Sequence, residues 1–225
     1  LGLKFLPLGN TGNQMGGWFN KEINTPSDYN GLKMRMPGLG GRTIEKLGAT
    51  PVLLAGPDVL PSLSSGAVDA AEWICPAADL GAGLYQAAKY YYGPGWHEPS
   101  TLLDLSMDLA SWEKLDTATQ GLVDDMTKSF NMTVFSRFQA ANGPALQKLL
   151  NEHNVQLRTF PDEVLIALGN AAGEVVSERG SINSETKAIC NHLLSFRKNI
   201  MDWSTKGESE FARIRNLSFK YPDSV

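Results

Sequence analysis

Apolar and polar positions alternate most clearly around residue 34. Leu32, Met34 and Met36 share one face of an extended segment. Lys33 and Arg35 share the other, as the two-residue period of a strand requires. Shorter apolar runs at 3–8, 50–55, 70–73, 89–92, 101–107 and 155–160 predict further strands.

Helical segments separate these strands in the first half of the chain. We expect helices from Gly38 to 47, from Asp58 to Ser65 and over 77–88. We expect Asp58 to cap the N-terminus of the second helix and Gly66 to end that helix in a left-handed conformation. Strands that alternate with helices predict an α/β fold with a largely parallel sheet.

The second half of the chain is mostly helical. Residues 112–154 predict a helix with one break at Gly143-Pro144, and residues 161–176 predict another. From residue 184 onward, apolar residues recur at steps of four and three, which is a heptad seam. The seam residues are Ile189, Leu193, Phe196, Ile200 and Trp203. Such a seam suits either a helix packed on its own domain or a helix exchanged between subunits.

Composition excludes several classes of function. The chain of 225 residues is 42% hydrophobic and 20% charged and carries a net charge of −4. No basic and aromatic stretch indicates nucleic-acid binding. The apolar runs are too short and interrupted to span a bilayer. Cys75 and Cys190 lack metal-site spacing, and we expect two separate thiols.

Candidate chemistry centres on Glu72 and Trp73, which end an apolar run and precede Pro76. In an open α/β sheet, ligands bind beyond the carboxyl ends of strands. The sequence contains no serine-hydrolase elbow, no zinc-protease motif and no phosphate-binding loop. Glu72 and Glu98 could act as paired carboxylates of an enzyme on a sugar or carbonyl substrate. An interaction module built on the C-terminal seam is a third possibility.

Four motifs together resemble the extracytoplasmic solute receptors of TRAP transporters, especially those for 2-oxo acids such as pyruvate. They are Gln-Met-Gly-Gly-Trp-Phe at 14–19, Leu-Lys-Met-Arg at 32–35, Ala-Glu-Trp at 71–73 and Tyr-Tyr-Tyr-Gly-Pro-Gly-Trp-His-Glu-Pro at 90–99. The resemblance implies a two-lobed, periplasmic-binding-protein-like α/β fold that lacks an N-terminal part. It implies second-lobe units at 1–70, a cleft-lining crossing segment at 71–110, a helical and strand return at 111–180, and a long dimerising helix at 181–225.

The resemblance also implies roles for individual residues. Arg35 matches the arginine that clamps the substrate carboxylate, a task suited to a planar guanidinium. Gln14, Glu72 and the carbonyl of Trp73 match ligands of a cation, sodium or calcium, beside the substrate. Glu98 matches a cleft carboxylate, and Trp18, Trp73 and Tyr92 match apolar walls around the ligand.

The implied protein is a periplasmic receptor, not an enzyme, that forms a homodimer and delivers a small 2-oxo or 2-hydroxy monocarboxylate to a membrane permease. One segment departs from the family pattern. After Trp73 the family has Gly-Pro, an aromatic and an acid, whereas this chain reads Ile-Cys-Pro-Ala-Ala-Asp. The missing aromatic leaves the identity of the bound acid open.

Overall fold

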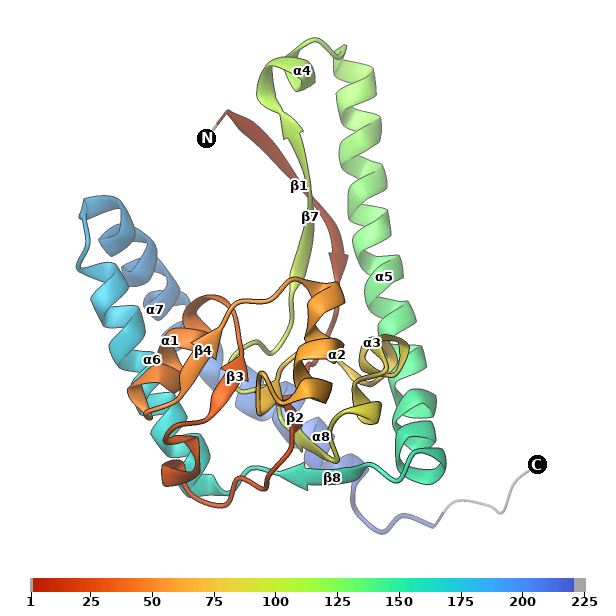
Figure 1. Cartoon of the computed structure of the whole chain (residues 1–225). Coiled ribbons are helices and arrows are strands. Elements are labelled where there is room, and N and C mark those ends of the chain that lie inside the picture. Colours follow the sequence, from red (N-terminus) through yellow and green to blue (C-terminus); the bar gives the residue numbers. More distant parts are fainter. Residues whose placement is uncertain (1, 221–225) are drawn as a thin grey trace. The chain divides into compact units, whose positions relative to one another are not determined.

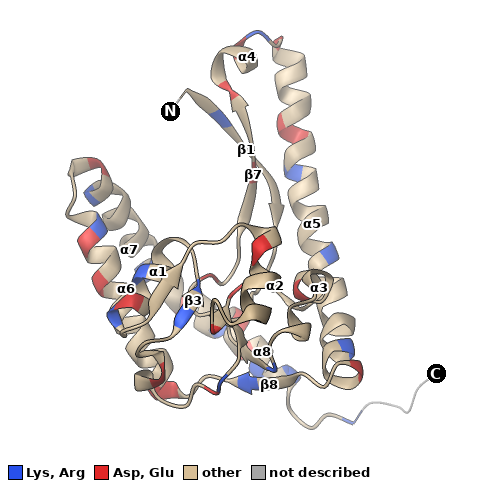
Figure 2. Ribbon diagram, viewed as in Figure 1, with Lys and Arg blue, Asp and Glu red and all other residues tan. Residues whose placement is uncertain are grey.

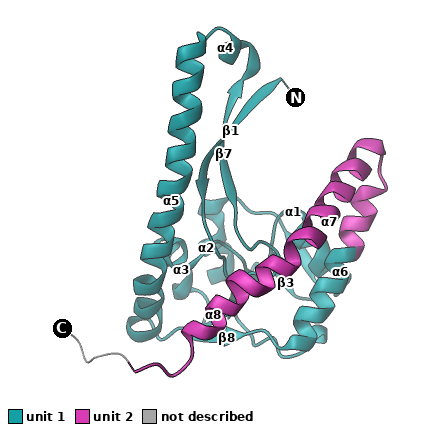
Figure 3. Cartoon of the chain, turned by 180° about the vertical axis from the view of Figure 1, so that it is seen from behind, with its two compact units in different colours: residues 1–173 teal, residues 174–225 magenta. Residues whose placement is uncertain are grey.

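The structure is a computed structural model that describes residues 2–220 (Figure 1). The chain divides into two compact units, Leu1–Gly173 and Glu174–Val225 (Figure 3). The first unit contains all the strands of the described chain and every motif of the expected ligand site. The four-part division made from the sequence stays a prediction.

A six-stranded sheet forms the centre of unit 1, in the order β4-β3-β5-β2-β6-β8. The strands are β2 Gly17–Phe19, β3 Lys33–Arg35, β4 Thr50–Val52, β5 Ala70–Ala71, β6 Tyr90–Gly93 and β8 Gln156–Thr159. Of its five pairings, β3·β4, β3·β5 and β6·β8 are parallel, and both pairings of β2 are antiparallel. The predicted α/β class with a mainly parallel sheet is therefore confirmed.

A separate antiparallel ribbon joins β1, Leu3–Asn10, to β7, Leu102–Asp108. Figure 1 shows it beside the long helix α5, Thr117–Glu152. Its register shifts between Pro7 and Gly9, as at a β-bulge. The ribbon brings residue 101 to residue 11, because the amide of Thr11 donates to the carbonyl of Thr101.

Two apolar clusters lie on opposite faces of the sheet. Phe19, Met34 and Ala70 belong to one cluster, whereas Trp18 and Ala71 belong to the other. Neighbouring residues separate in this way because successive side chains of a strand point to opposite faces. Leu32, Met34 and Met36 are all buried, as their alternation predicts.

Helices cover both faces of the sheet in unit 1. They are α1 Gly38–Lys46, α2 Gly56–Ser65, α3 Pro76–Ala82, part of α5 and the first part of α6 Asp162–Gly180, with 3-10 turns at Pro26–Tyr29 and Leu84–Gln86. A further short helix, α4 Leu109–Glu113, contacts the β1–β7 ribbon instead (Figure 1). Side chains of α6 join the cluster of Met34, and side chains of α2 and α5 join the cluster of Trp18. Lys and Arg are interspersed with Asp and Glu along these elements (Figure 2).

Several boundaries differ from the sequence prediction. The cap of α2 is Ala55, and Asp58 lies inside its first turn. The expected helix over 77–88 ends at Ala82, because Gly83 adopts a left-handed conformation. The helix α5 runs through Pro144 without the expected break. Gly143 has no Cβ to clash with the proline ring, so the helix can continue there.

Unit 2 consists mainly of α7, Ser184–Ser204, followed by a π-helical turn at Thr205–Ser209 and α8, Glu210–Arg215. The five seam side chains are exposed, from 36% for Ile200 to 69% for Trp203. Cys75 and Cys190 are free thiols, as expected. In the described part of the chain, every helix is too short or too polar to cross a bilayer.

The end of α2 offers a test of the fold. Gly66 has φ +75, and a Cβ built there meets no atom within 4 Å. Gly66→Ala should therefore lower the free energy of unfolding by about 1 to 2 kcal/mol through backbone strain alone. Gly81→Ala is the control, because Gly81 is helical with equally open space, and it should be neutral or stabilising. Urea denaturation measures the free energy of unfolding of both variants. Equal losses of stability would contradict the left-handed conformation of Gly66.

Candidate functional site

The candidate site lies at the carboxyl ends of the parallel strands β3 and β5. Arg35 is the last residue of β3 and pairs with Ala71 of β5. Glu72 and Trp73 follow β5 directly, beyond the strand in which the sequence had placed them. The amide of Glu72 donates to the carbonyl of Arg35 at 3.1 Å. Parallel pairing therefore brings the two charged side chains, 37 residues apart, to one edge of the sheet.

Arg35 and Glu72 form a buried ion pair. Nη1 of Arg35 contacts Oε1 of Glu72 and also donates to the Glu72 carbonyl at 2.9 Å. The two side chains are 11% and 3% exposed. The guanidinium lies 5.3 Å from the centre of the Trp73 ring, within cation–π range. These contacts hold the guanidinium in one orientation.

The other edge of the guanidinium has unused hydrogen-bonding capacity. Nε of Arg35 is buried and has no partner within residues 2–220. Leaving a buried donor unpaired costs roughly 1–3 kcal/mol. The Nε–Nη2 edge, opposite the Nη1 contact, is one that a carboxylate can accept in two parallel bonds. Arg35 can therefore retain Glu72 and bind a second carboxylate.

Gln14 lies close to the segment that follows β5. Its chain neighbour Met15 donates its amide to the carbonyl of Ile74 at 2.9 Å. The Gln14 side chain is buried, and its Nε2 donates to the hydroxyls of Thr11 at 3.0 Å and Thr101 at 2.7 Å. These bonds leave Oε1 as a buried acceptor with no partner in the described chain.

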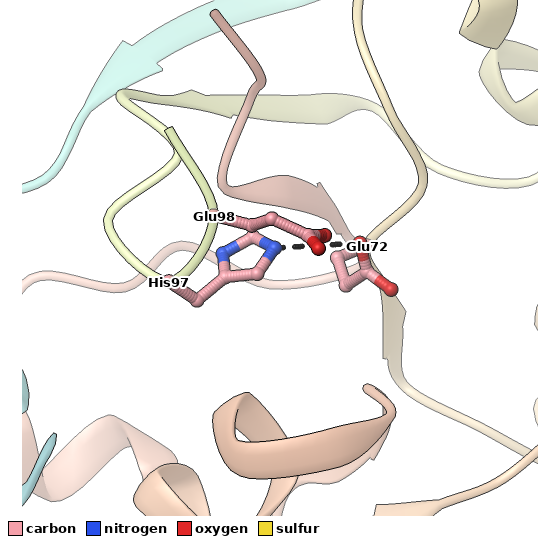
Figure 4. Close-up of side chains that lie close together, drawn as sticks. All are labelled: Glu72, His97 and Glu98. Carbon is pink, nitrogen blue, oxygen red and sulfur yellow. Dashed lines mark hydrogen bonds and ion pairs between the residues drawn. The ribbon is translucent and has the colours of Figure 1, made fainter. Parts of the chain in front are cut away.

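His97 and Glu98 complete the polar cluster, which Figure 4 shows with their side chains directed toward Glu72. Nε2 of His97 lies 3.4 Å from Oε2 of Glu72. One potential ligand atom from each of Glu72, His97 and Glu98 lies within 4.8 Å of the others. His97 lies within the motif at 90–99, but the sequence assigned it no role at the site, although its position beside Glu98 was an available signal.

The donor set is suitable for a hard cation. Glu72 supplies a carboxylate, and Oε1 of Gln14 supplies an unpaired amide oxygen. No backbone amide of the described chain donates to the carbonyl of Trp73. Such oxygens are typical ligands of calcium and similar hard ions. His97 adds an imidazole at the edge of the same cluster.

The structure places Trp18 differently from the apolar wall expected of it. Trp18 is fully buried, stacks on Tyr91 with ring centres 4.1 Å apart, and donates Nε1 to Oδ2 of Asp79 at 2.9 Å. A side chain without exposed surface cannot border a solvent-filled ligand site in this conformation. We therefore assign Trp18 to the core. Tyr92, expected as a second wall, is also buried and stacks on Phe160 with ring centres 4.6 Å apart.

Asp79 is a buried carboxylate that the sequence analysis did not single out as functional. Tyr91 Oη donates to Oδ2 at 2.7 Å, and the amide of Ile74 donates to Oδ1 at 3.0 Å. Burial raises the pKa of Asp79 to about 6, although these bonds and that from Trp18 oppose the increase. Burial likewise raises the pKa of Tyr91, so its hydroxyl remains a donor to Asp79.

This chain is similar to known proteins in both sequence and fold. Residues 1–181 match the family described as bacterial extracellular solute-binding protein, family 7. A monocarboxylate 2-oxoacid-binding periplasmic protein of Nostoc sp. is 37% identical over 212 residues, which are 94% of this chain and 58% of that protein.

Two crystal structures are also similar. A TRAP periplasmic solute-binding protein from Pseudoalteromonas atlantica, with bound sodium and pyruvate, has a TM-score of 0.89 and 34% identity over 97% of this chain and 65% of that one. Another, from Bordetella bronchiseptica, is a dimer with calcium and picolinate. It has a TM-score of 0.91 and 34% identity, and the match covers 95% of this chain and 63% of that one. The chain thus spans about three fifths of the length of these proteins, whose fold confirms the predicted periplasmic-binding-protein class.

The raised pKa of Asp79 predicts a pH-dependent stability. The native state binds the proton of the Asp79 carboxyl more tightly than the unfolded chain does. The stability that this proton contributes is therefore largest at low pH and is lost as the pH rises from 3.8 through about 6. Relative to Asp79→Asn, which does not titrate, the wild type should lose on the order of 3 kcal/mol over this range. Urea denaturation at a series of pH values measures the difference. If the stability of the wild type relative to Asp79→Asn stayed constant or increased as the pH rises, the prediction would be contradicted.

Proposed function

The chain belongs to the bacterial extracellular solute-binding proteins of family 7, and from that premise we propose that it is the periplasmic receptor of a TRAP transporter. The proposed ligand is a small 2-oxo or 2-hydroxy monocarboxylate such as pyruvate, bound together with a sodium or calcium ion. The receptor would deliver this ligand to the permease subunits in the membrane.

The observation that carries the proposal is the unpaired Nε of Arg35 at the end of β3. Nη1 is occupied by Glu72, which fixes the orientation of the guanidinium. Nε and the adjacent Nη2 form an edge that can donate to both oxygens of one carboxylate, and lysine cannot reproduce that planar geometry. A buried cationic donor edge without a partner is what a receptor for a small organic anion needs.

The cation would be held by Oε1 of Gln14, the carboxylate of Glu72 and the carbonyl of Trp73. When bound, it supplies positive charge that offsets the negative charge of Glu72 beside an anionic ligand. A 2-oxo or 2-hydroxy acid offers such an ion two oxygens, one from the carboxylate and one from the adjacent carbon. The ligand and the cation then share one site.

Trp73 and Glu98 would border the ligand. Trp73 is half-buried and packs against the guanidinium, so its indole can cover the apolar part of a small acid. Glu98 lies in the cluster with Glu72 and His97, where it can accept a hydrogen bond from a ligand hydroxyl. The core position of Trp18 leaves it with an indirect role through Asp79.

An enzyme that uses Glu72 and Glu98 as acid and base fits less well. Oε1 of Glu72 is already paired with Arg35, and Oε2 lies 3.4 Å from Nε2 of His97, so both oxygens of this carboxylate are engaged within the protein. The family is one of solute-binding proteins, and its description names no reaction. We therefore propose a receptor that releases its ligand unchanged.

Dimerisation through α7 is the second part of the proposal. Large apolar side chains of the seam, among them Leu193, Phe196 and Trp203, are exposed in the single chain. Exposed apolar stripes of this kind mark interaction surfaces, and a heptad seam is suited to another helix. The Bordetella bronchiseptica relative is described as a dimer, and we propose the same for this protein.

Ligand titration tests the proposed function. Intrinsic Trp fluorescence of the purified protein should change on addition of pyruvate, 2-oxobutyrate or lactate, and binding should weaken when sodium and calcium are removed. Arg35→Lys should weaken binding roughly 10- to 100-fold, because a bidentate charged hydrogen bond is lost.

Arg42→Lys is the matched control for this titration, since Arg42 is exposed on α1, and it should bind as the wild type does. No response to any of the three acids, with either cation present, would exclude the proposed ligand class. An affinity of Arg35→Lys within a few-fold of the wild type would exclude Arg35 as the clamp.

The dimer proposal is tested by a charge placed in the seam. Leu193→Asp should convert the dimer to a monomer in light scattering coupled to size-exclusion chromatography, because a buried unpaired carboxylate is costly. Leu53→Asp serves as the control, because Leu53 is 80% exposed in unit 1 and lies outside the seam. A monomeric wild type, or a Leu193→Asp variant that stays dimeric, would contradict the proposal.

A further inference from the structure

We propose that Asp79 is a positioning residue for the cation site, which acts by fixing the peptide that carries the carbonyl of Trp73. The proposal rests on the function proposed above, because it concerns how one cation ligand is held. It assigns to a buried carboxylate outside the ligand cluster a role in cation affinity.

The peptide between Trp73 and Ile74 connects the two groups. Its N–H donates to Oδ1 of Asp79 at 3.0 Å. A trans peptide is planar, and its carbonyl points opposite to its N–H. The bond to Asp79 therefore fixes the rotation of the plane and directs the Trp73 carbonyl to the side away from Asp79.

The neighbouring carbonyls are already occupied. The carbonyl of Glu72 accepts from Nη1 of Arg35 at 2.9 Å, and the carbonyl of Ile74 accepts from the amide of Met15 at 2.9 Å. Between them, the Trp73 carbonyl accepts from no backbone amide within residues 2–220. This leaves one directed acceptor in a segment whose other carbonyls hold the site together.

Asp79 is itself held rigidly, which a positioning residue requires. It is fully buried in the first turn of α3. Its Oδ2 accepts from Nε1 of Trp18 on β2 and from Oη of Tyr91 on β6. The two carboxylate oxygens thus have separate tasks, because Oδ2 anchors the side chain to the sheet and Oδ1 holds the peptide of Ile74.

A purely structural role for Asp79 makes a different prediction. If Asp79 only stabilises the core, then Tyr91→Phe, which removes a bond to Oδ2 and keeps the stacked ring, should affect binding in proportion to its effect on stability. If Asp79 positions the peptide, Tyr91→Phe should lower stability and leave cation affinity unchanged, because Ile74 keeps its acceptor.

The experiment measures the affinity for sodium and for calcium, from pyruvate-induced Trp fluorescence at increasing cation concentration. Asp79→Ala should weaken cation affinity about 10- to 100-fold, as loss of an outer-shell partner does. At saturating cation its pyruvate affinity should return to near the wild-type value, because Arg35 is unaltered. Tyr91→Phe should remain within about twofold of the wild type for both ligands, well below the change that loss of the outer-shell partner causes.

The outcomes separate the inference from the function on which it rests. A wild type that binds neither pyruvate nor a cation contradicts the proposed function. A wild type that binds both, with an Asp79→Ala variant of equal cation affinity, contradicts the positioning role alone. Equal losses in Asp79→Ala and Tyr91→Phe would assign Asp79 to the stability of the core and also overturn the proposal.

A second measurement needs no variant and covers the case in which Asp79→Ala does not fold. Amide hydrogen exchange of Ile74 is followed in the wild type loaded with calcium and pyruvate. The bond to Asp79 should slow this exchange at least about 100-fold relative to an unprotected amide, as expected for a buried hydrogen bond that opens rarely. Exchange at the unprotected rate would show that the peptide is not held and would overturn the proposal.

Discussion

The buried pair of Arg35 and Glu72 is the interaction on which the site depends. Each charge would be costly in the interior alone, and each is tolerated because the other compensates it. The parallel pairing of β3 with β5 sets their separation, since both side chains stand at the carboxyl ends of adjacent strands. Nε of the same guanidinium has no partner in the described chain, so the contact that fixes the arginine also defines where an anion can bind.

Three of the six buried polar side-chain atoms that lack a partner in the described chain belong to residues of this site, and the other three are on Tyr29, Trp96 and Asn131. Oε1 of Gln14, Nε of Arg35 and Nδ1 of His97 are all buried without a partner in the described chain. Buried polar groups in folded proteins are almost always hydrogen-bonded. Three exceptions on residues of the proposed site therefore agree with a place that is completed by a bound anion and a cation.

Local sequence patterns predicted much of the fold, and they were wrong where packing overrides local preference. The alternation around Met34 located β3 and its buried face, and Gly66 marked the end of α2. Pro144 was expected to break a helix, but α5 is held against α3, where Asn142 accepts from the amide of Ala77 at 3.1 Å. The preceding glycine and this contact offset the backbone hydrogen bond that Pro144 cannot make. The general expectation that proline breaks a helix takes account of neither effect.

The sequence by itself determined most of the strand and helix order, the chemical types at the site and, through four motifs, the family to which the chain belongs. It did not predict β2, Gly17–Phe19, which pairs with β5 and β6 in the middle of the sheet. The features that it determined depend on local spacing and residue identity. Only the tertiary structure decided that Trp18 belongs to the core, that His97 joins Glu72, and that Asp79 reaches the peptide of Ile74. These contacts join residues from different elements, and strand register and helix packing determine which of them meet.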